Sequence, residues 1–258
     1  MTSQDGREGK GKDPGRKRAK TRGVAGGKAN PGEERPSLGE NLRSIGIAVA
    51  LFLLLRAFIL QTFFITSGSM EDTMLVGDFL VVNRAAVGSR IPFTQIRVPG
   101  YSGIERGDIL VFDPTHEPDL KLVKRLIGLP GDTLEMRDGV LFLNGEEQDE
   151  PYVKRDGIPD GGDPSMFWQA EHLLPDVDRT RYEPTRNNWG PLLIPEGRYF
   201  MLGDNRDSSL DSRYWGLLER WRFEGRVSFI YFSYNRGSYQ PFPWLREIRW
   251  GRIFNGVN

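Results

Sequence analysis

The 258-residue chain contains no cysteine, and histidine occurs at only two positions, His116 and His172. The absence of cysteine excludes disulfide bonds, thiolate catalysis and zinc sites built on cysteine. The sequence also lacks the glycine-rich phosphate-binding loop and the H-E-x-x-H zinc motif. We therefore expect no metal and no other cofactor, and we look for chemistry among hydroxyl, carboxylate, lysine and arginine side chains.

A formal net charge of zero hides an uneven distribution of charge. Between Lys10 and Lys28 there are eight basic residues and one acid, Asp13. This stretch is rich in glycine and lacks large apolar side chains, so we expect residues 1–41 to be a disordered basic tail. Such a tail could bind nucleic acid. Its position before an apolar run instead favours a role in membrane topology, with the N-terminus in the cytoplasm and no nucleic acid as partner.

One long apolar run extends over 21 positions, from Ile45 to Ile65. As a helix it would be about 30 Å long, which is the thickness of the hydrocarbon layer of a membrane. We expect a transmembrane helix over residues 42–62, with everything that follows on the far side of the membrane. A cleaved signal peptide and a buried helix of a soluble domain are the alternatives. Arg56 interrupts the run, and we expect its long side chain to reach the outer interface. The span would then be Leu42 to Leu60, and the following residues would be interfacial or begin a strand.

The remainder of the sequence is typical of a β protein, with 31 glycines and 17 prolines in the chain. Short apolar or β-branched runs bounded by Gly, Pro or Asp predict strands at 79–84, 108–112, 122–127, 197–203 and 226–234. The stretch 133–145 predicts a hairpin, because two alternating runs flank Asp138-Gly139, a pair that favours a type I′ turn. Asn144-Gly145 closes the second strand.

We expect these strands to form one mostly antiparallel β domain from residues 63–144 and 196–258. Residues 145–195 are rich in Pro, Asp and Gly with weak periodicity, which favours an inserted, loop-rich subdomain. The fold class predicted from the sequence is therefore mostly β, with a loop-rich insertion and one preceding transmembrane helix.

Two short stretches combine residues that suit nucleophilic chemistry. In Ser67-Gly68-Ser69-Met70 the glycine lets the backbone approach a substrate closely, although such a triplet is most often a turn. In the strand at 122–127, Lys124 shares a face with two leucines. Burial there would lower its pKa and make the amine a general base, whereas an exposed edge-strand lysine would stay charged.

A third stretch, 203–213, has three acids, two arginines and three serines in eleven residues. The oxygen spacing of a calcium loop is met from Asp207, but Ser212 and Leu218 stand where the Gly and Glu of that loop belong, so the EF-hand interpretation fails. Internal Asp–Arg pairs are the simpler interpretation. The turn 128–132, Gly-Leu-Pro-Gly-Asp, is expected to end the strand that carries Lys124.

Taken in order, these stretches resemble the type I signal peptidase (leader peptidase) family from about Leu42 to the C-terminus. The similarity rests on four motifs, SGSMEDTMLVGDFLVV (67–82), RGDILVF (106–112), KRLIGLPGD (124–132) and GDNRDSSLDSR (203–213). The family is implied to be a mostly antiparallel β protease with a variable insertion and a Ser–Lys dyad in place of a Ser–His–Asp triad. Two positions depart from its pattern: Thr66 and Asp72 stand where the family often has Pro, and both affect the shape of a turn.

By motif position, the resemblance implies that Ser69 is the nucleophile and Lys124 its general base. It implies that Ser67 forms an oxyanion hole with the Ser69 backbone N–H, and that Ser209 orients the lysine amine. The supporting ion pairs implied near the site involve Arg125, Asp204, Asp211 and Arg213. The residues implied to line small apolar substrate pockets are Phe63, Ile65, Met70, Met74 and Val123.

The activity implied by the resemblance is removal of N-terminal signal peptides from exported preproteins after small-x-small motifs. The enzyme would sit in the cell membrane with its catalytic domain on the outer face, with the lipid bilayer and the secretion machinery as further partners. A self-cleaving repressor-like or organelle-processing relative is a second hypothesis, which the apolar run disfavours. A single-pass membrane scaffold or an inactive relative is a third, which the presence of both dyad residues disfavours.

Overall fold

The structure is a computed structural model that describes residues 38–58, 60–90, 94, 96–115, 117 and 120–257. The expected basic tail falls almost wholly outside these residues, and so does His116. The chain divides into two units, Met1–Ser44 and Ile45–Asn258. Within the described residues the first unit contains only the beginning of helix α1, Leu38–Phe58, and the fold described below is that of the second unit.

The apolar run of the sequence is divided between a helix and a strand. Helix α1 ends at Phe58, and strand β1, Leu60–Phe64, pairs antiparallel with β2, Asp78–Asn83. The helix expected over residues 42–62 therefore ends earlier, because the last residues of the run hydrogen-bond with a neighbouring strand. Across the part of the chain described here, no helix combines the length and apolar character needed to cross a membrane.

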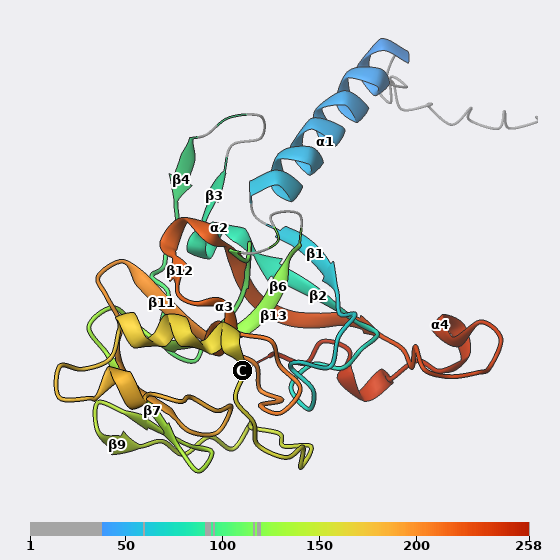
Figure 1. Cartoon of the computed structure of the whole chain (residues 1–258). Helices are drawn as coiled ribbons and strands as arrows, with labels where there is room; N and C mark the ends of the chain where they lie inside the picture. The colour runs from blue at the N-terminus through green and yellow to red at the C-terminus, as the bar shows by residue number, and fades with distance from the viewer. Residues whose placement is uncertain are drawn as a thin grey trace, which may run out of the picture. The chain divides into compact units, whose positions relative to one another are not determined.

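A seven-stranded antiparallel sheet forms the larger part of the fold, in the order β1-β2-β13-β5-β6-β11-β12 (Figure 1). Its further strands are β5 (Ile109–Phe112), β6 (Leu122–Gly128), β11 (Arg198–Leu202), β12 (Leu218–Glu219) and β13 (Phe223–Ser233). The strands predicted at 79–84, 108–112, 122–127, 197–203 and 226–234 correspond to β2, β5, β6, β11 and β13, so the prediction of a mostly antiparallel β fold is confirmed.

A four-stranded sheet, in the order β10-β7-β8-β9, continues the chain from the end of β6. Its strands are β7 (Thr133–Arg137), β8 (Val140–Leu143), β9 (Glu146–Glu147) and β10 (Trp189–Leu193). The predicted β7–β8 hairpin is present, and Asp138 and Gly139 have φ values of 48° and 81°. Positive φ at both central residues is the geometry of a type I′ turn, as the sequence predicted.

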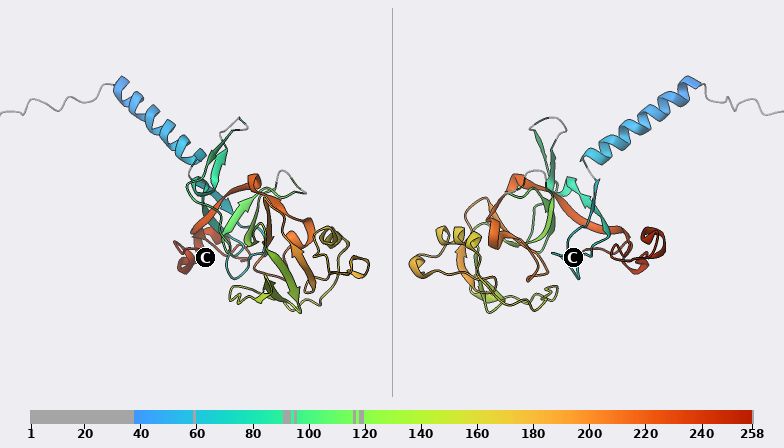
Figure 2. Two further views of the ribbon diagram at one scale, coloured as in Figure 1. Left: turned by 90° about the vertical axis from the view of Figure 1, so that its left-hand side faces the viewer. Right: turned by 45° about the vertical axis from the view of Figure 1, so that its right-hand side comes forward.

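A two-stranded ribbon of β3 (Gly88–Arg90) and β4 (Arg97–Pro99) stands out from the larger sheet (Figures 1 and 2). Short helices connect the remaining elements. They are α2 (Arg84–Val87), α3 (Ser212–Trp215), α4 (Pro243–Arg246), and the 3₁₀ helices η1 (Pro164–Glu171), η2 (Arg179–Arg181), η3 (Arg220–Arg222) and η4 (Trp250–Arg252). Helix η1 packs against α3, which places part of the expected insertion beside the loop at 203–213.

The segment expected to be an inserted subdomain shares its core with the second sheet. Its strand β10 pairs with β7, and one buried apolar cluster contains residues from both sides of the segment's borders. Members of that cluster are Leu134, Met136, Leu141, Met166, Leu173, Trp189, Leu192, Ile194 and Phe200. The segment thus buries its apolar side chains against the hairpin and β11 instead of forming a separate core.

Candidate active site

Ser69 lies in a turn that is held at both ends by the larger sheet. The turn connects β1 to β2, and the Ile65 and Gly77 amides donate to the carbonyls of Asp78 and Ile65 at 2.9 and 3.1 Å. The buried Asp78 carboxylate accepts the Leu75 amide at 2.8 Å and binds Arg252 at 2.7 Å. These contacts restrict the backbone around Ser69, whose side chain is almost buried.

Lys124 projects from β6 toward this turn. Its Nζ lies 2.5 Å from Ser69 Oγ, and the lysine is 2% exposed. The strand places it there because Lys124 pairs with Leu110 of β5, in the interior of the sheet. The structure therefore brings together the two side chains that the resemblance implied to form a dyad.

The surroundings of Lys124 favour the neutral amine. Burial lowers the pKa of Lys124 from 10.5 to about 8, although Asp211 and Asp204 act to raise the pKa and Arg213 acts to lower it. A primary amine with a pKa near 8 is about one-tenth neutral at pH 7, against less than about one part in 10³ for an ordinary lysine, and the neutral amine is the form able to accept a proton. The sequence left open whether Lys124 is buried or exposed, and the structure shows it buried.

The nearby acids are each paired with an arginine. Arg125 donates to both Asp204 carboxylate oxygens, at 2.9 and 2.7 Å, and Arg213 binds Asp211 in the same two-point way at 2.8 Å. Leu202, the last residue of β11, pairs with Arg125, so Asp204 follows directly beside it. All four side chains are almost fully buried, and the paired charges leave the lysine amine without a carboxylate hydrogen bond among the described residues.

The two other serines of the implied site differ in their surroundings. Ser67 is exposed, and its Oγ lies 3.4 Å from Ser69 Oγ, so it faces the same space as the candidate nucleophile. Ser209 is 5% exposed, and its side chain hydrogen-bonds the Asp211 carboxylate and helps to hold the pKa of Asp211 low, whereas no hydrogen bond joins it to Lys124 within the described part of the chain. The closeness of Ser209 to the site is clear from Gly203, where a Cβ would lie 2.1 Å from Ser209 Oγ and 2.5 Å from the Ser69 carbonyl oxygen.

A pocket of about 220 Å³ opens beside Ser69 and Lys124. Strand β1 and the residue stretch 120–124 form its two walls. Phe63, Ile65, Met70 and Val123 line it together with Ser67, whereas Met74 is fully buried in the core cluster and does not reach it. Four of the five residues implied to line a substrate pocket thus surround the dyad.

Sequence reasoning missed several side chains that contact the supporting pairs. Thr73 Oγ1 donates to Asp204 Oδ2 at 2.6 Å, and the Arg125 guanidinium lies 3.8 Å from the centre of the Tyr152 ring. Arg206 forms a two-point pair with Glu150 at 2.9 and 2.6 Å. No local pattern could have indicated these contacts, because they join residues 27 to 131 positions apart. Within the described residues, no group of three or more His, Asp or Glu side chains could hold a metal ion.

Comparison with known proteins places these features in a family. Residues 38–232 match the family model described as signal peptidase, peptidase S26. The chain is 41% identical over 190 residues to a signal peptidase I of Pseudomonas aeruginosa, covering 70% of this chain and 64% of the relative. It is 36% identical to a signal peptidase I of Pseudomonas fluorescens, with the same coverage, and 35% identical to one of Bacillus licheniformis, covering 78% of this chain and 92% of the relative.

The match thus spans 64% of the length of the Pseudomonas relatives, which is less than two thirds, and 92% of the Bacillus one. The family model covers more than half of this chain and includes Ser69, Lys124 and the loop at 203–213. The resemblance inferred from the four motifs is confirmed, and the chain belongs to the signal peptidase family, peptidase S26.

Proposed function

We propose that this protein is a membrane-bound serine endopeptidase that cleaves signal peptides from exported preproteins after small-x-small motifs. The observation that carries the proposal is the 2.5 Å separation of Ser69 Oγ and Lys124 Nζ at a buried site where the lysine pKa is about 8. Membership of the signal peptidase family supports the choice of substrate. The proposal needs no metal and no cofactor.

The reaction would proceed by acyl transfer to the serine. The neutral Lys124 amine takes the Ser69 hydroxyl proton as Oγ attacks the scissile carbonyl carbon, and the resulting ammonium then protonates the leaving amine of the mature chain. Water, deprotonated by the same amine, hydrolyses the ester and restores Ser69. Each step requires Lys124 to change its charge, and a site that is dry and close to neutral in total charge makes both forms accessible.

Stabilisation of the developing oxyanion would come from Ser67 and the backbone. Ser67 Oγ lies on the same side of the turn as Ser69 Oγ, at 3.4 Å, where its hydroxyl can donate to an oxygen bound near Oγ. The Ser69 backbone N–H would be the second donor. Removing one such donor typically lowers the rate about 10²- to 10³-fold. We assign Ser209 to orientation of the Lys124 amine, in keeping with its burial and its position beside Gly203 and the Ser69 turn.

The substrate would bind as an extended strand between β1 and residues 120–124. The pocket there has apolar walls from Phe63, Ile65, Met70 and Val123 and a volume of about 220 Å³, which suits small side chains near the scissile bond. An extended peptide at a strand edge gains main-chain hydrogen bonds, and its alternate side chains enter the pocket.

The apolar run that begins at Ile45 supports attachment to the lipid bilayer, with the basic tail in the cytoplasm and the β domain on the outer face of the cell membrane. A nucleophile that follows this run by a few residues would meet signal peptides as they leave the bilayer. The secretion machinery that delivers them would be a further partner.

The test is cleavage of a preprotein whose leader ends in Ala-x-Ala, using purified full-length chain in detergent. We expect the wild type to release the mature protein, with cleavage after the second Ala confirmed by mass spectrometry. Ser69→Ala and Lys124→Met should each lower the rate by at least about 10³-fold. His172→Ala is the matched control and should retain activity, because histidine takes no part in the reaction.

Two results would contradict the proposal. Processing by Ser69→Ala at the wild-type rate would exclude Ser69 as the nucleophile. A correctly folded wild type that leaves the preprotein intact in detergent and in lipid vesicles would favour the scaffold or inactive-relative hypothesis.

A further inference from the structure

A short segment of the expected insertion lies across the loop that carries Asp204. We call residues 150–156 the strap. The Lys154 amide donates to the Asp204 carbonyl, and the Arg206 amide donates to the Lys154 carbonyl, both at 2.9 Å. These two bonds form a parallel bridge between the strap and residue 205. The strap therefore fixes the backbone of the 203–213 loop from outside the sheet.

Side chains hold the strap at both ends. At its start, Glu150 forms a two-point pair with the fully buried Arg206. At its end, Asp156 accepts hydrogen bonds from Asn205 Nδ2 at 2.8 Å and Ser208 Oγ at 2.7 Å. Between them, Lys154 Nζ lies 3.0 Å from Glu71, two residues after Ser69. The strap thus contacts both the acidic loop and the turn of the candidate nucleophile.

Tyr152, in the middle of the strap, holds the arginine that neutralises Asp204. The Arg125 guanidinium lies over the Tyr152 ring at 3.8 Å while its edge binds both Asp204 oxygens. The Tyr152 hydroxyl donates to Glu150 Oε1 at 2.8 Å, which fixes the ring. Ring stacking and a two-point carboxylate contact together leave the guanidinium one orientation.

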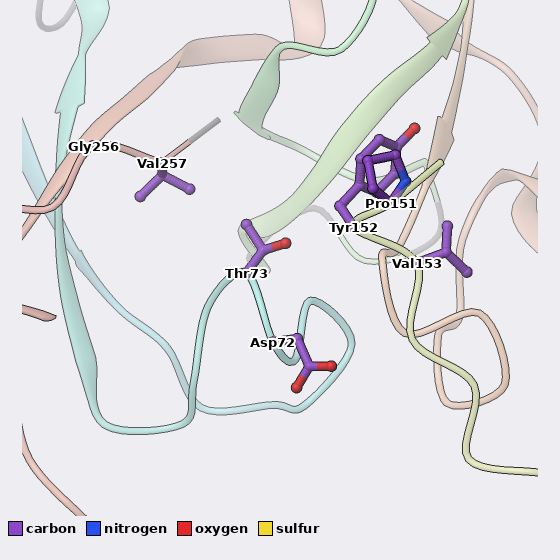
Figure 3. Close-up of a pocket in the computed structure, with 7 residues that line it drawn as sticks. All are labelled: Asp72, Thr73, Pro151, Tyr152, Val153, Gly256 and Val257. Atoms are coloured by element: carbon purple, nitrogen blue, oxygen red, sulfur yellow. The ribbon is translucent and has the colours of Figure 1, made fainter. Parts of the chain in front are cut away.

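The tyrosine also covers Arg125 on the strap side, while Arg125 lines a second open pocket of about 570 Å³ that Tyr152 does not border. An open pocket of about 410 Å³ is bordered by the strap, by the turn after Ser69 and by the C-terminal segment (Figure 3). Tyr152 lines it from the strap, and Thr73 lines it from the turn. Both residues contact the Asp204–Arg125 pair directly, so they form the boundary between this pocket and the pair.

We propose that Tyr152 is a positioning residue for the reaction: by stacking on Arg125 it keeps the Arg125–Asp204 pair closed and dry, so that Asp204 remains neutralised beside Lys124. The inference rests on the proposed function for its kinetic readout. It assigns a catalytic consequence to a residue that touches neither the dyad nor the substrate pocket.

The charged groups around Lys124 and Tyr152 determine whether loss of the Tyr152 ring raises or lowers the Lys124 pKa. Lys124 is influenced by Asp211, Asp204 and Arg213, and Tyr152 is influenced by Glu150, Arg206 and Arg125. Without the ring, Arg125 gains contact with water on the strap side as well and binds Asp204 less tightly, so the Asp204 carboxylate acts more strongly on the amine. Entry of water also weakens the burial that lowers the Lys124 pKa. Both changes raise that pKa and reduce the neutral fraction below it.

The test compares Tyr152→Leu with Tyr152→Phe, because Phe keeps the ring over Arg125 and Leu removes it. We expect Tyr152→Leu to shift the acid limb of the kcat/KM profile upward by about 0.5 to 1 pH unit, with an Ala-x-Ala peptide as substrate. This shift corresponds to a loss of about three- to tenfold at pH 6.5 and less than about twofold on the alkaline plateau. Tyr152→Phe should keep the wild-type midpoint.

Tyr182→Leu is the matched control. Tyr182 also lies between β9 and β10 and is partly buried, and its hydroxyl is bonded to Gln169 and Gly190 instead of the supporting pairs. We expect this change to lower stability without moving the acid limb. An equal loss for Tyr152→Leu at every pH, or an equal shift in Tyr182→Leu, would overturn the inference.

A second readout is independent of proteolysis. In protein labelled with ¹³C-lysine, the Cε signal that disappears in Lys124→Met reports the Lys124 pKa directly by NMR titration. Tyr152→Leu should raise that pKa, and an unchanged value would reject the positioning role even if the protein cleaves no signal peptide. Failure of the wild type to cleave, with the expected NMR shift, would instead reject only the proposed function.

Discussion

At the scale of single residues, the burial that lowers the Lys124 pKa also lowers the stability of the fold. Burial favours the neutral amine, and the same burial makes the charged amine costly in the folded state. The pKa difference between 10.5 and about 8 corresponds to about 3 kcal/mol. The folded pKa is below the unfolded one, so this penalty is complete below pH 8 and disappears as the pH rises to 10.5.

We therefore expect Lys124→Met to raise the melting temperature at pH 7 by a few degrees. The unfolding free energy rises by the cost of burying the charged amine, less about 1 kcal/mol for the hydrogen bond that Ser69 loses. Thermal unfolding should show the gain shrinking between pH 8 and pH 10.5, where the wild type no longer buries a charge. Lys121→Met is the control, because Lys121 is exposed and pairs with Asp113 and Glu224 at the surface. A Lys124→Met protein less stable than the wild type at pH 7 would show that Lys124 contributes more as a hydrogen-bond partner than its burial costs.

At the scale of elements, the site depends on the close approach of two loops. Gly203 follows β11, and its backbone lies against the Ser69 carbonyl and the Ser209 hydroxyl, with no room for a side chain. The Asn205 amide donates to the same Ser69 carbonyl at 3.1 Å. The position of Ser69 is therefore set jointly by the β1–β2 turn and by the first residues of the 203–213 loop.

Gly203→Ala should accordingly move the Ser69 turn. A Cβ at 2.5 Å from a backbone oxygen cannot be accommodated by rotation of a side chain, so we expect a loss of about 1–3 kcal/mol in unfolding free energy and a large loss of peptidase activity. Gly103→Ala is the matched control, because nothing lies within 4 Å of a Cβ at that position. Denaturant unfolding and peptide cleavage measure the two effects, and wild-type activity in Gly203→Ala would contradict the close approach.

Elements with a strong local pattern could be predicted from the sequence. The alternating strands β6 to β8 and the Asp138-Gly139 turn follow from side-chain period and backbone preference, which act over a few residues. Strands β10 and β12 could not be predicted, because they form through pairing with β7 and β11 and carry little pattern of their own, and β3 and β4 are three residues each without a run of apolar side chains. The helix expected over residues 42–62 ends at Phe58, and the strand that the sequence allowed after the span begins at Leu60, because β1 forms where β2 is present to pair with it.

The candidate site was predictable to the extent that its residues stand in recognisable motifs. The candidate dyad and the Asp–Arg pairs stand in the four stretches that resemble the family. The pocket residues Phe63, Ile65 and Val123 lie just outside these stretches and were implied only by analogy, and Met74 does not reach the pocket. Tyr152, Thr73 and Glu150 could not be placed, because their roles come from contacts across long separations in the sequence. Tyr152 in particular lies in a segment whose weak periodicity predicted only loops.

At the scale of the whole molecule, the two larger sheets meet at Asp132. Strand β6 of the seven-stranded sheet ends at Gly128, and strand β7 of the four-stranded sheet begins at Thr133. Between them, the Asp132 carboxylate binds Arg106 at 2.8 and 3.1 Å and accepts hydrogen bonds from the Leu129 amide and Asn144. Burial alone would raise the pKa of Asp132, but the hydrogen bonds from Arg106, Leu129 and Asn144 and the charge of Arg106 hold it below its usual value of 3.8.

The Asp132 carboxylate should make the folding stability depend on pH in the acid range. Because the folded pKa of Asp132 is below the unfolded value, its contribution is present above about pH 3.8 and is lost as the pH falls through the folded pKa. Burial raises the pKa of Asp211, but Arg213 holds it below its usual value, so Asp211 also contributes stability that is lost in acid. We expect the melting temperature to fall between pH 5 and pH 2.5.

The variant that isolates the junction is Asp132→Asn, which imitates the protonated carboxyl. It should melt below the wild type at pH 7, and the difference between the two should shrink as the pH falls, because the wild type then carries a neutral side chain as well. Asp176→Asn, at an exposed position, should match the wild type throughout. A difference between wild type and Asp132→Asn that stays constant down to pH 2.5 would mean that amide and carboxyl differ in packing and not in charge, and that the charge of Asp132 does not stabilise the junction between the sheets.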